Sequence, residues 1–178
     1  MGHISTVSLV LTVIGDDRPG LVEQVATAIS QHQANWLESS MSHLAGKFAG
    51  IVCVSVAEAQ LDALKTALAA LPGLRITAEV SAPAETKVGN RRLKLSLVGH
   101  DRIGIVREVS QVLARHSINV EDLSTHTASA PMSADLLFHA TAELTASPTL
   151  DSRALTADLE SLSNDLMVDI TLDETIRT

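Results

Sequence analysis

The sequence predicts an α+β fold in which one βαββαβ unit occurs twice along the chain. The first observation is an internal repeat: GDDRPGLVEQVA, which begins at Gly15, returns 84 residues later as GHDRIGIVREVS, which begins at Gly99. Eight of the 21 positions from 15 to 35 are identical in the two copies. The second observation is that strand-like and helix-like apolar spacing alternate in the same order in both copies. A repeat of this length predicts two domains rather than a solenoid.

The first copy contains four predicted strands and two predicted helices. Pro19 suits the first turn of the first helix, where its missing N–H costs nothing, and Pro72-Gly73 ends the second helix. A turn at Ala45-Gly46 separates the two middle strands. The strands are predicted at 4–14, 35–44, 47–57 and 74–81, and the helix faces at Leu21, Val22, Val25, Ala28 and Ile29 and at Leu61, Leu64, Leu68 and Leu71.

The second copy repeats this order with a longer hairpin that contains Pro131. Its predicted strands are 93–98, 118–127, 134–143 and 166–172, and its predicted helices are 103–116 and 149–164. The domains are therefore expected at 1–82 and 91–178, joined by a short polar linker at 83–90.

A βαββαβ unit of about 80 residues is the ferredoxin-like arrangement. Its four strands form one antiparallel sheet with both helices on one face. An edge strand of such a sheet needs pairing or protection. Two copies in one chain could meet this need by pairing their edges into one eight-stranded sheet.

Composition excludes several classes of function. The formal net charge is −8, which argues against direct binding to nucleic acid, because a phosphate backbone requires clustered Lys and Arg. RNA-binding domains with this element order carry stacking aromatics, whereas this chain has only Trp36, Phe48 and Phe138.

No apolar run reaches the roughly 20 residues of a membrane span, and no signal peptide precedes the first strand. The single cysteine, Cys53, fits a reducing compartment and a buried structural role. We therefore expect a cytoplasmic protein.

The repeated loop Gly-x-Asp-Arg-x-Gly joins the first strand to the first helix of each copy. The N–H groups at such a helix start attract a small carboxylate, and Gly20 and Gly104 let a ligand approach the backbone. Asp17 and Asp101 either accept an ammonium group, which would complete a site for an amino acid, or cap the helix at about 1 kcal/mol each. In the purely structural interpretation, the glycines that open the loops only permit a turn.

The Asp-Arg-Pro-Gly-Leu-Val turn, the helix after it and the Asn that opens the next strand resemble ACT domains. Both copies show the resemblance, which covers nearly the whole chain. ACT domains usually have Asn-Ile-x-Asp at the start of the second strand. The second copy, with Asn119-Val120-Glu121-Asp122, resembles this pattern more closely than the first, with Asn35-Trp36-Leu37-Glu38. The resemblance implies regulation by a small effector that binds between the strand–helix loop of one domain and the second strand of its neighbour. The implied ligand-binding residues are Gly15, Asp17, Arg18, Gly20, Leu21 and Asn35 in the first copy and Asp101, Arg102, Gly104, Ile105 and Asn119 in the second.

The resemblance further implies a small amino acid as effector, glycine first and serine second. It implies a DNA-binding transcription factor as an indirect, protein–protein partner, with homo-dimerisation as a further expectation. The alternative is a constitutive interaction module that binds no ligand.

We find no sequence signature of catalysis or of a cofactor, and none of the seven histidines has the spacing of a helical zinc motif. His32 and His116 stand at the ends of the first helices, where a positive charge favours the helix dipole. His126 and His139 could meet across a hairpin, but no metal site is predicted there. We expect a protein that is not an enzyme.

Overall fold

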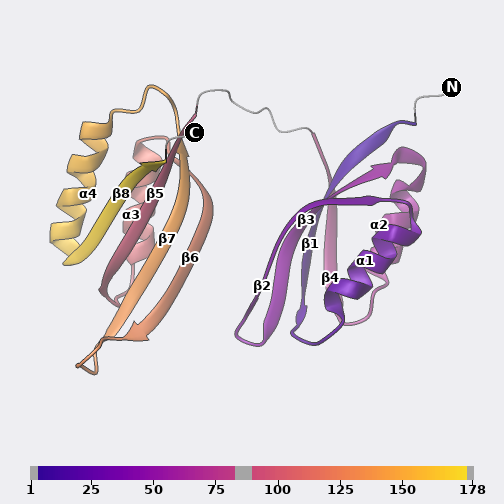
Figure 1. Ribbon diagram of the computed structural model, residues 1–178, viewed down its shortest axis with the longest axis horizontal. Coiled ribbons are helices and arrows are strands. Elements are labelled where there is room, and N and C mark those ends of the chain that lie inside the picture. Colours follow the sequence, from indigo (N-terminus) through magenta and orange to yellow (C-terminus); the bar gives the residue numbers. More distant parts are fainter. Residues whose placement is uncertain (1–3, 83–89, 176–178) are drawn as a thin grey trace. The chain divides into compact units, whose positions relative to one another are not determined.

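The computed structural model describes residues 4–82 and 90–175, in which the βαββαβ order occurs twice. The chain divides into two compact units, residues 1–85 and 86–178. The predicted linker at 83–90 lies outside the described residues except for Asn90. Each unit has two α-helices and one sheet, and Figure 1 shows that the sheets are twisted.

The first unit follows the sequence prediction closely. Its strands β2, β3 and β4 have the predicted bounds, and β1 is shifted by two residues towards the loop. A 3-10 turn at Glu58–Gln60 precedes its second helix. The elements are β1 (Thr6–Asp16), α1 (Leu21–Gln31), β2 (Asn35–Leu44), β3 (Lys47–Ala57), α2 (Leu61–Ala69) and β4 (Leu74–Ser81).

The second unit has the same order with later helix starts than predicted. Its first helix begins at Ile105 rather than at 103, and its second begins at Ser152 rather than at 149 because Asp151 caps it. The elements are β5 (Arg91–His100), α3 (Ile105–Arg115), β6 (Asn119–Ser129), β7 (Leu136–Ala146), α4 (Ser152–Leu166) and β8 (Val168–Thr175).

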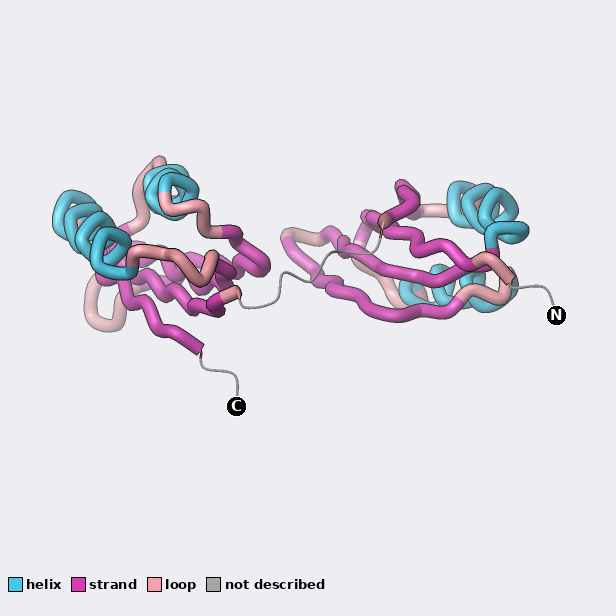
Figure 2. Tube along the Cα trace, turned by 90° about the horizontal axis from the view of Figure 1, so that it is seen from above, coloured by secondary structure: helices cyan, strands magenta, loops and turns pink. Residues whose placement is uncertain are grey.

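Each unit has its own antiparallel four-stranded sheet. The strand orders are β2-β3-β1-β4 and β6-β7-β5-β8, the order of a ferredoxin-like fold. In Figure 2 the two helices of the second unit lie together on one face of its sheet. The pairing of the two sheets into one of eight strands stays a prediction.

The core of each unit fills the space between the sheet and its helices. In β1 the buried residues alternate as Leu9, Leu11 and Val13, while α1 contributes Val25 and Ile29 at helical spacing. The corresponding residues of β5 and α3 form the second core. Both cores consist of aliphatic side chains, as the scarcity of aromatics predicts.

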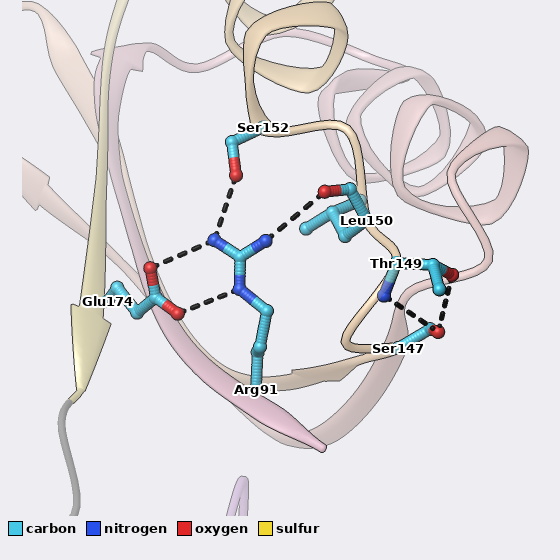
Figure 3. Close-up of polar contacts among 6 residues, drawn as sticks. All are labelled: Arg91, Ser147, Thr149, Leu150, Ser152 and Glu174. Atoms are coloured by element: carbon cyan, nitrogen blue, oxygen red, sulfur yellow. Dashed lines mark hydrogen bonds and ion pairs between the residues drawn. The ribbon is translucent and has the colours of Figure 1, made fainter. Parts of the chain in front are cut away.

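A cluster of hydrogen bonds around Arg91, at the start of β5, connects three parts of the second unit (Figure 3). The Arg91 guanidinium donates to both carboxylate oxygens of Glu174 in β8, at 2.8 and 2.9 Å, and to the Ser152 hydroxyl at 2.8 Å. It also donates to the Leu150 carbonyl at 3.2 Å. A single side chain thus ties the last strand to the connection between β7 and α4.

The glycines that open the two loops do not form turns, so that part of the structural interpretation is wrong. Gly15 and Gly99 are paired residues of β1 and β5. A Cβ at Gly15 would lie 2.5 Å from the Gly73 carbonyl oxygen, and one at Gly99 would lie 2.2 Å from a methyl carbon of Val168. Glycine is needed here because neighbouring chain comes close.

Candidate functional site

The turn between β1 and α1 is built on a left-handed glycine. Gly20 is the N-cap of α1 with φ 88°, and Gly104 is the N-cap of α3 with φ 96°. A Cβ at Gly20 would meet nothing within 4 Å. The backbone conformation rather than a lack of space therefore selects glycine at this position.

The helix starts have no side-chain cap. Neither Asp17 nor Asp101 accepts a hydrogen bond from the first turn of its helix, so the alternative in which they cap the helix is wrong. Pro19 also lies before the N-cap and not in the first helical turn. Asp17, Arg18 and Pro19 lie between the end of β1 and the left-handed glycine, Gly20. The N–H groups of the first helical turn lack intrahelical partners and carry the positive end of the helix dipole.

The backbone of each loop is fixed to the neighbouring hairpin. The Asp17 N–H donates to the Gly46 carbonyl at 3.0 Å, and the Asp101 N–H donates to the Leu136 carbonyl at 2.9 Å. In the first unit the Asp17 carboxylate also lies 3.4 Å from Nδ1 of His43, whose side chain is exposed. The Asp17 side chain therefore faces the hairpin and not the helix axis.

The arginines of the two loops have different partners. Arg18 donates to the Pro72 carbonyl at 3.0 Å and to the amide oxygen of Gln24 at 3.5 Å. Arg102 forms an ion pair with Glu108 at 2.9 Å. Gln24 and Glu108 hold equivalent positions in the repeat, so the second loop has a carboxylate where the first has a neutral amide.

Four of the predicted ligand-binding residues line one surface hollow in the first unit. This hollow offers about 300 Å³ and is lined by Asp17, Arg18, Gly20, Leu21, Val22, Glu23 and Phe48. Its walls carry two carboxylates and one guanidinium beside the start of α1. The arrangement provides partners for both charges of a zwitterion.

Gly15 lines a neighbouring hollow of about 310 Å³ together with Asp16, Lys47 and Gly73. Asp16 and Lys47 form an ion pair, and the Lys47 hydrogen bond and charge lower the pKa of the Asp16 carboxyl. The positive charge of Lys47 is therefore partly neutralised by the Asp16 carboxylate.

The asparagine predicted for the first site does not join this cluster within its unit. Gly15 pairs with Phe48 in β3, whereas Asn35 pairs with Ser55, which in turn pairs with Ser8. Gly15 is seven positions along β1 from Ser8, which corresponds to roughly 20 Å. Asn35 thus stands at the opposite end of the sheet from the loop.

The second unit repeats this separation. Asn119 pairs with Thr145, which pairs with Arg92, seven residues along β5 from Gly99. Asp101, Arg102 and Gly104 lie in the turn before α3, and Ile105 is its first, buried residue. The predicted residues of each unit therefore fall into two groups at opposite ends of a sheet.

His43 and Phe48 are site residues that the sequence analysis missed. They face each other across the β2–β3 hairpin, and Phe48 is paired with Gly15. The two-residue turn at Ala45-Gly46 fixes this register. Counting back from that turn would have placed His43 beside the end of β1.

The histidines predicted at helix ends are there: His32 and His116 are the C-cap residues of α1 and α3. The ring of His32 lies 2.8 Å from the Ala28 carbonyl, and Nε2 of His116 lies 2.7 Å from a carboxylate oxygen of Asp158 in α4. These contacts confirm a structural position for both residues.

His126 and His139 meet across the β6–β7 pair, as expected, with their rings stacked 4.7 Å apart. Within residues 4–82 and 90–175, no group of three or more His, Cys, Asp or Glu is placed to hold a metal ion. No helix in the same ranges is long and apolar enough to cross a membrane.

Comparison with known proteins decides the family. The family model for the ACT domain matches residues 8–80 and again residues 91–173. The chain belongs to the ACT domain family. The two matches coincide with the two βαββαβ units, so this is a tandem ACT protein.

Two solved structures resemble this tandem ACT chain over nearly its whole length. An unknown protein from Galdieria sulphuraria is 31% identical, with a TM-score of 0.82, over 97% of this chain and 100% of that one. The crystal structure of a "putative glycine cleavage system transcriptional repressor" is 20% identical, with a TM-score of 0.73, over 97% of this chain and 99% of that one. At that identity, the second likeness shows the fold.

A curated relative matches a shorter segment. A UPF0237 protein from Methanopyrus kandleri is 38% identical over 53 residues, which is 30% of this chain. The match spans 59% of that relative's length.

Proposed function

We propose that this tandem ACT protein is a non-catalytic regulator that binds a small amino acid at the β1–α1 turn of its first unit. The observation that carries the proposal is the hollow of about 300 Å³ in which Asp17, Arg18 and Gly20 meet. Glycine is the first candidate ligand, because a structurally similar protein is described as a putative repressor of the glycine cleavage system; serine is the second.

Both charges of an amino acid have a partner in this hollow. The α-carboxylate would accept hydrogen bonds from the uncapped N–H groups at the start of α1 and from Arg18. The ammonium group would donate to Asp17, which already lies 3.4 Å from His43. Leu21, Val22 and Phe48 form the apolar part of the lining.

We further propose that Asn35 and Asn119 contribute from a neighbouring ACT domain. Each stands at the opposite end of its sheet from the loop of its own unit, so only another domain can bring an asparagine to that loop. The neighbour would be the other unit of this chain, paired into an eight-stranded sheet, or a unit of a second copy in a homo-dimer.

The output of binding would be a changed affinity for a protein partner. We propose a DNA-binding transcription factor of the glycine cleavage type, approached in the cytoplasm by protein–protein contact. The net charge of −8 opposes direct binding of this chain to DNA. The ligand can shift the partner equilibrium by no more than its differential affinity for the two states.

A second candidate is a constitutive interaction module that binds no ligand. It is favoured by the internal partners that both arginines already have: Arg18 donates to the Pro72 carbonyl, and Arg102 pairs with Glu108. In this case the charged turns only stabilise the loops.

Thermal unfolding of the full chain with each of the twenty amino acids separates the two candidates. A ligand that binds only the native state raises its stability by about 2.7 kcal/mol at one hundred times its Kd. We expect glycine or serine to raise Tm and Asp17→Asn to remove the effect, with calorimetry giving the stoichiometry. Asp62→Asn, in the first turn of α2, is the control and should leave the ligand effect intact.

Absence of any Tm shift at millimolar amino acid would overturn the sensing proposal. The constitutive module would then be tested by capture of its transcription factor with the Asp17→Asn chain, which should bind as well as the wild type.

A further inference from the structure

The sheet of the first unit has an apolar open face on the side away from the core. Alternate residues of β1, beginning with Leu9, are buried in that core, so Val10, Thr12 and Ile14 face the other way. Ile51 of β3 pairs with Thr12 in the middle of this face and is 56% exposed. The outer face of an antiparallel sheet is usually polar. The apolar residues of the open face are Val10, Ile14, Ala49, Ile51 and Cys53.

The equivalent face of the second unit is polar. Lys94 of β5 is the counterpart of Val10 in the repeat. Lys94 pairs with Glu143 of β7, and Thr141 holds the place that Ile51 has in the first unit. The fold therefore does not require apolar side chains on this face, and a contiguous apolar patch on one unit alone favours contact with another surface.

Strand β4 carries one charge of each sign on the open face. Glu79 and Arg75 lie two residues on either side of Thr77. Thr77 pairs with Thr12, and Thr12 pairs with Ile51, so these three residues form the central row of the face. Glu79 and Arg75 are separated by roughly 13 Å along the strand, which is too far for them to pair with each other.

A two-fold axis along the central row makes the open face complementary to itself. It places Glu79 of each copy opposite Arg75 of the other, and Val10 opposite Ile14, since these residues flank the central row on either side. Packed sheets lie about 10 Å apart, a gap that arginine and glutamate side chains span together. A two-fold axis parallel to the strands would instead place Glu79 opposite Glu38 of the other edge strand, β2. The charges therefore select the first arrangement.

We propose that the open face of the first unit binds the same face of a second copy of this chain, about the two-fold axis along the central row. The contact uses neither the strand edges nor the β1–α1 turn, so it does not depend on amino-acid binding or on edge pairing. Four strands of about 20 Å give each copy a face of roughly 400 Å², about half of what a standard interface buries on each side. We therefore expect a reversible dimer that dissociates in the micromolar range.

Sedimentation velocity of the full chain from micromolar to millimolar concentration, without amino acid, measures the association. Ile51→Lys should weaken the dimer by about tenfold or more, because it buries an ammonium group that has no partner. The Ile51 side chain is exposed within its own unit, so this change leaves the core intact. Thr141→Lys, the same change at the equivalent position of the second unit, is the control and should leave the association unchanged.

Two charge variants test the axis itself. Glu79→Arg and Arg75→Glu each place like charges across the interface, so each chain alone should associate more weakly than the wild type. In an equimolar mixture, a mixed dimer regains both ion pairs. The mixture should therefore associate more tightly than either variant by itself.

The single cysteine, Cys53, reports whether the face is covered. Its labelling by a thiol reagent should slow as the concentration of the wild type rises, but not in Ile51→Lys. The proposal is overturned if the chain stays monomeric at millimolar concentration, or if Ile51→Lys dimerises as tightly as the wild type. Protection of Cys53 that is independent of concentration would show that the same chain covers the face, and a mixture no tighter than its components would exclude the axis; either result overturns the proposal.

Discussion

Gly99 and Val168 approach so closely across the β5–β8 pair that a Cβ on Gly99 would lie 2.2 Å from the Val168 Cγ1 atom. Val168 is buried, at 4% exposure, and begins the last strand. The contact explains why a strand interior carries glycine, a residue that usually weakens strands.

Gly99→Ala should destabilise the second unit by about 1–3 kcal/mol, the usual cost of overpacking. Urea unfolding followed by circular dichroism measures the change. The same substitution in a Val168→Ala background should cost less, because the nearest clashing atom, Cγ1, is gone, while Cβ at 2.8 Å remains. Equal costs in the two backgrounds would show that the Cγ1 methyl group is not the cause.

The strands that the sequence predicted best are those bounded by strong turn residues. The strands β2, β3 and β4 begin and end where expected. The turn residues Ala45-Gly46 and Pro72-Gly73 mark the boundaries of these β-branched segments. The helix starts were less accurate. The left-handed conformation of Gly104 delays α3 to Ile105, and apolar spacing alone does not reveal a backbone dihedral angle.

The candidate site was predictable only in part. The repeat marked Asp17, Arg18 and Gly20 as a group, and the structure brings these residues to one hollow. The repeat did not reveal that Asn35 lies at the other end of the sheet, because the position of Asn35 depends on the register between strands. The role of Gly15 was also hidden, because its close neighbour Gly73 is distant in sequence.

The Arg91–Glu174 pair predicts a stability loss in acid. The hydrogen bond from Arg91 lowers the pKa of the Glu174 carboxyl below its ordinary value of 4.5, so protonation is less favourable in the folded chain than in the unfolded one. The pair's contribution is therefore present above about pH 4.5 and is lost as pH falls through the lower folded pKa.

Glu174→Gln should flatten this acid limb in urea unfolding series recorded between neutral and acid pH. Glu79→Gln, a change at an exposed glutamate of β4 in the other unit, is the control and should retain the limb. An unchanged acid limb in Glu174→Gln would show that other carboxylates cause the loss.

Asp151 caps α4 and should matter to stability for that reason. Its carboxylate accepts hydrogen bonds from the N–H groups of Arg153 and Ala154, both at 3.1 Å. Asp151→Ala should lower the free energy of unfolding by about 0.5–2 kcal/mol, as for other helix N-caps. Asp165→Ala, near the C-terminus of the same helix, is the control. It should be neutral or slightly stabilising, because an acidic residue opposes the dipole there.

The difference between Gln24 and Glu108 predicts which turn binds the proposed amino acid. In the second unit Glu108 already pairs with Arg102 at 2.9 Å and brings a negative charge beside the start of α3. Its carboxylate and the Arg107 guanidinium both lie 3.8 Å from the place of a Cβ on Gly104. A ligand carboxylate at that turn would have to compete with Glu108 for Arg102, whereas Arg18 in the first turn has only neutral partners, Gln24 and the Pro72 carbonyl.

Gln24→Glu should therefore copy the second loop into the first and weaken amino-acid binding by about tenfold. Glu108→Gln should leave the first site intact and raise the stoichiometry, because it frees Arg102. Calorimetric titration with glycine or serine, whichever raises Tm of the wild type, measures both. Tight binding by the Gln24→Glu chain would contradict the assignment of Arg18 and the α1 start to the ligand carboxylate. Loss of binding in Glu108→Gln would instead place the site in the second unit.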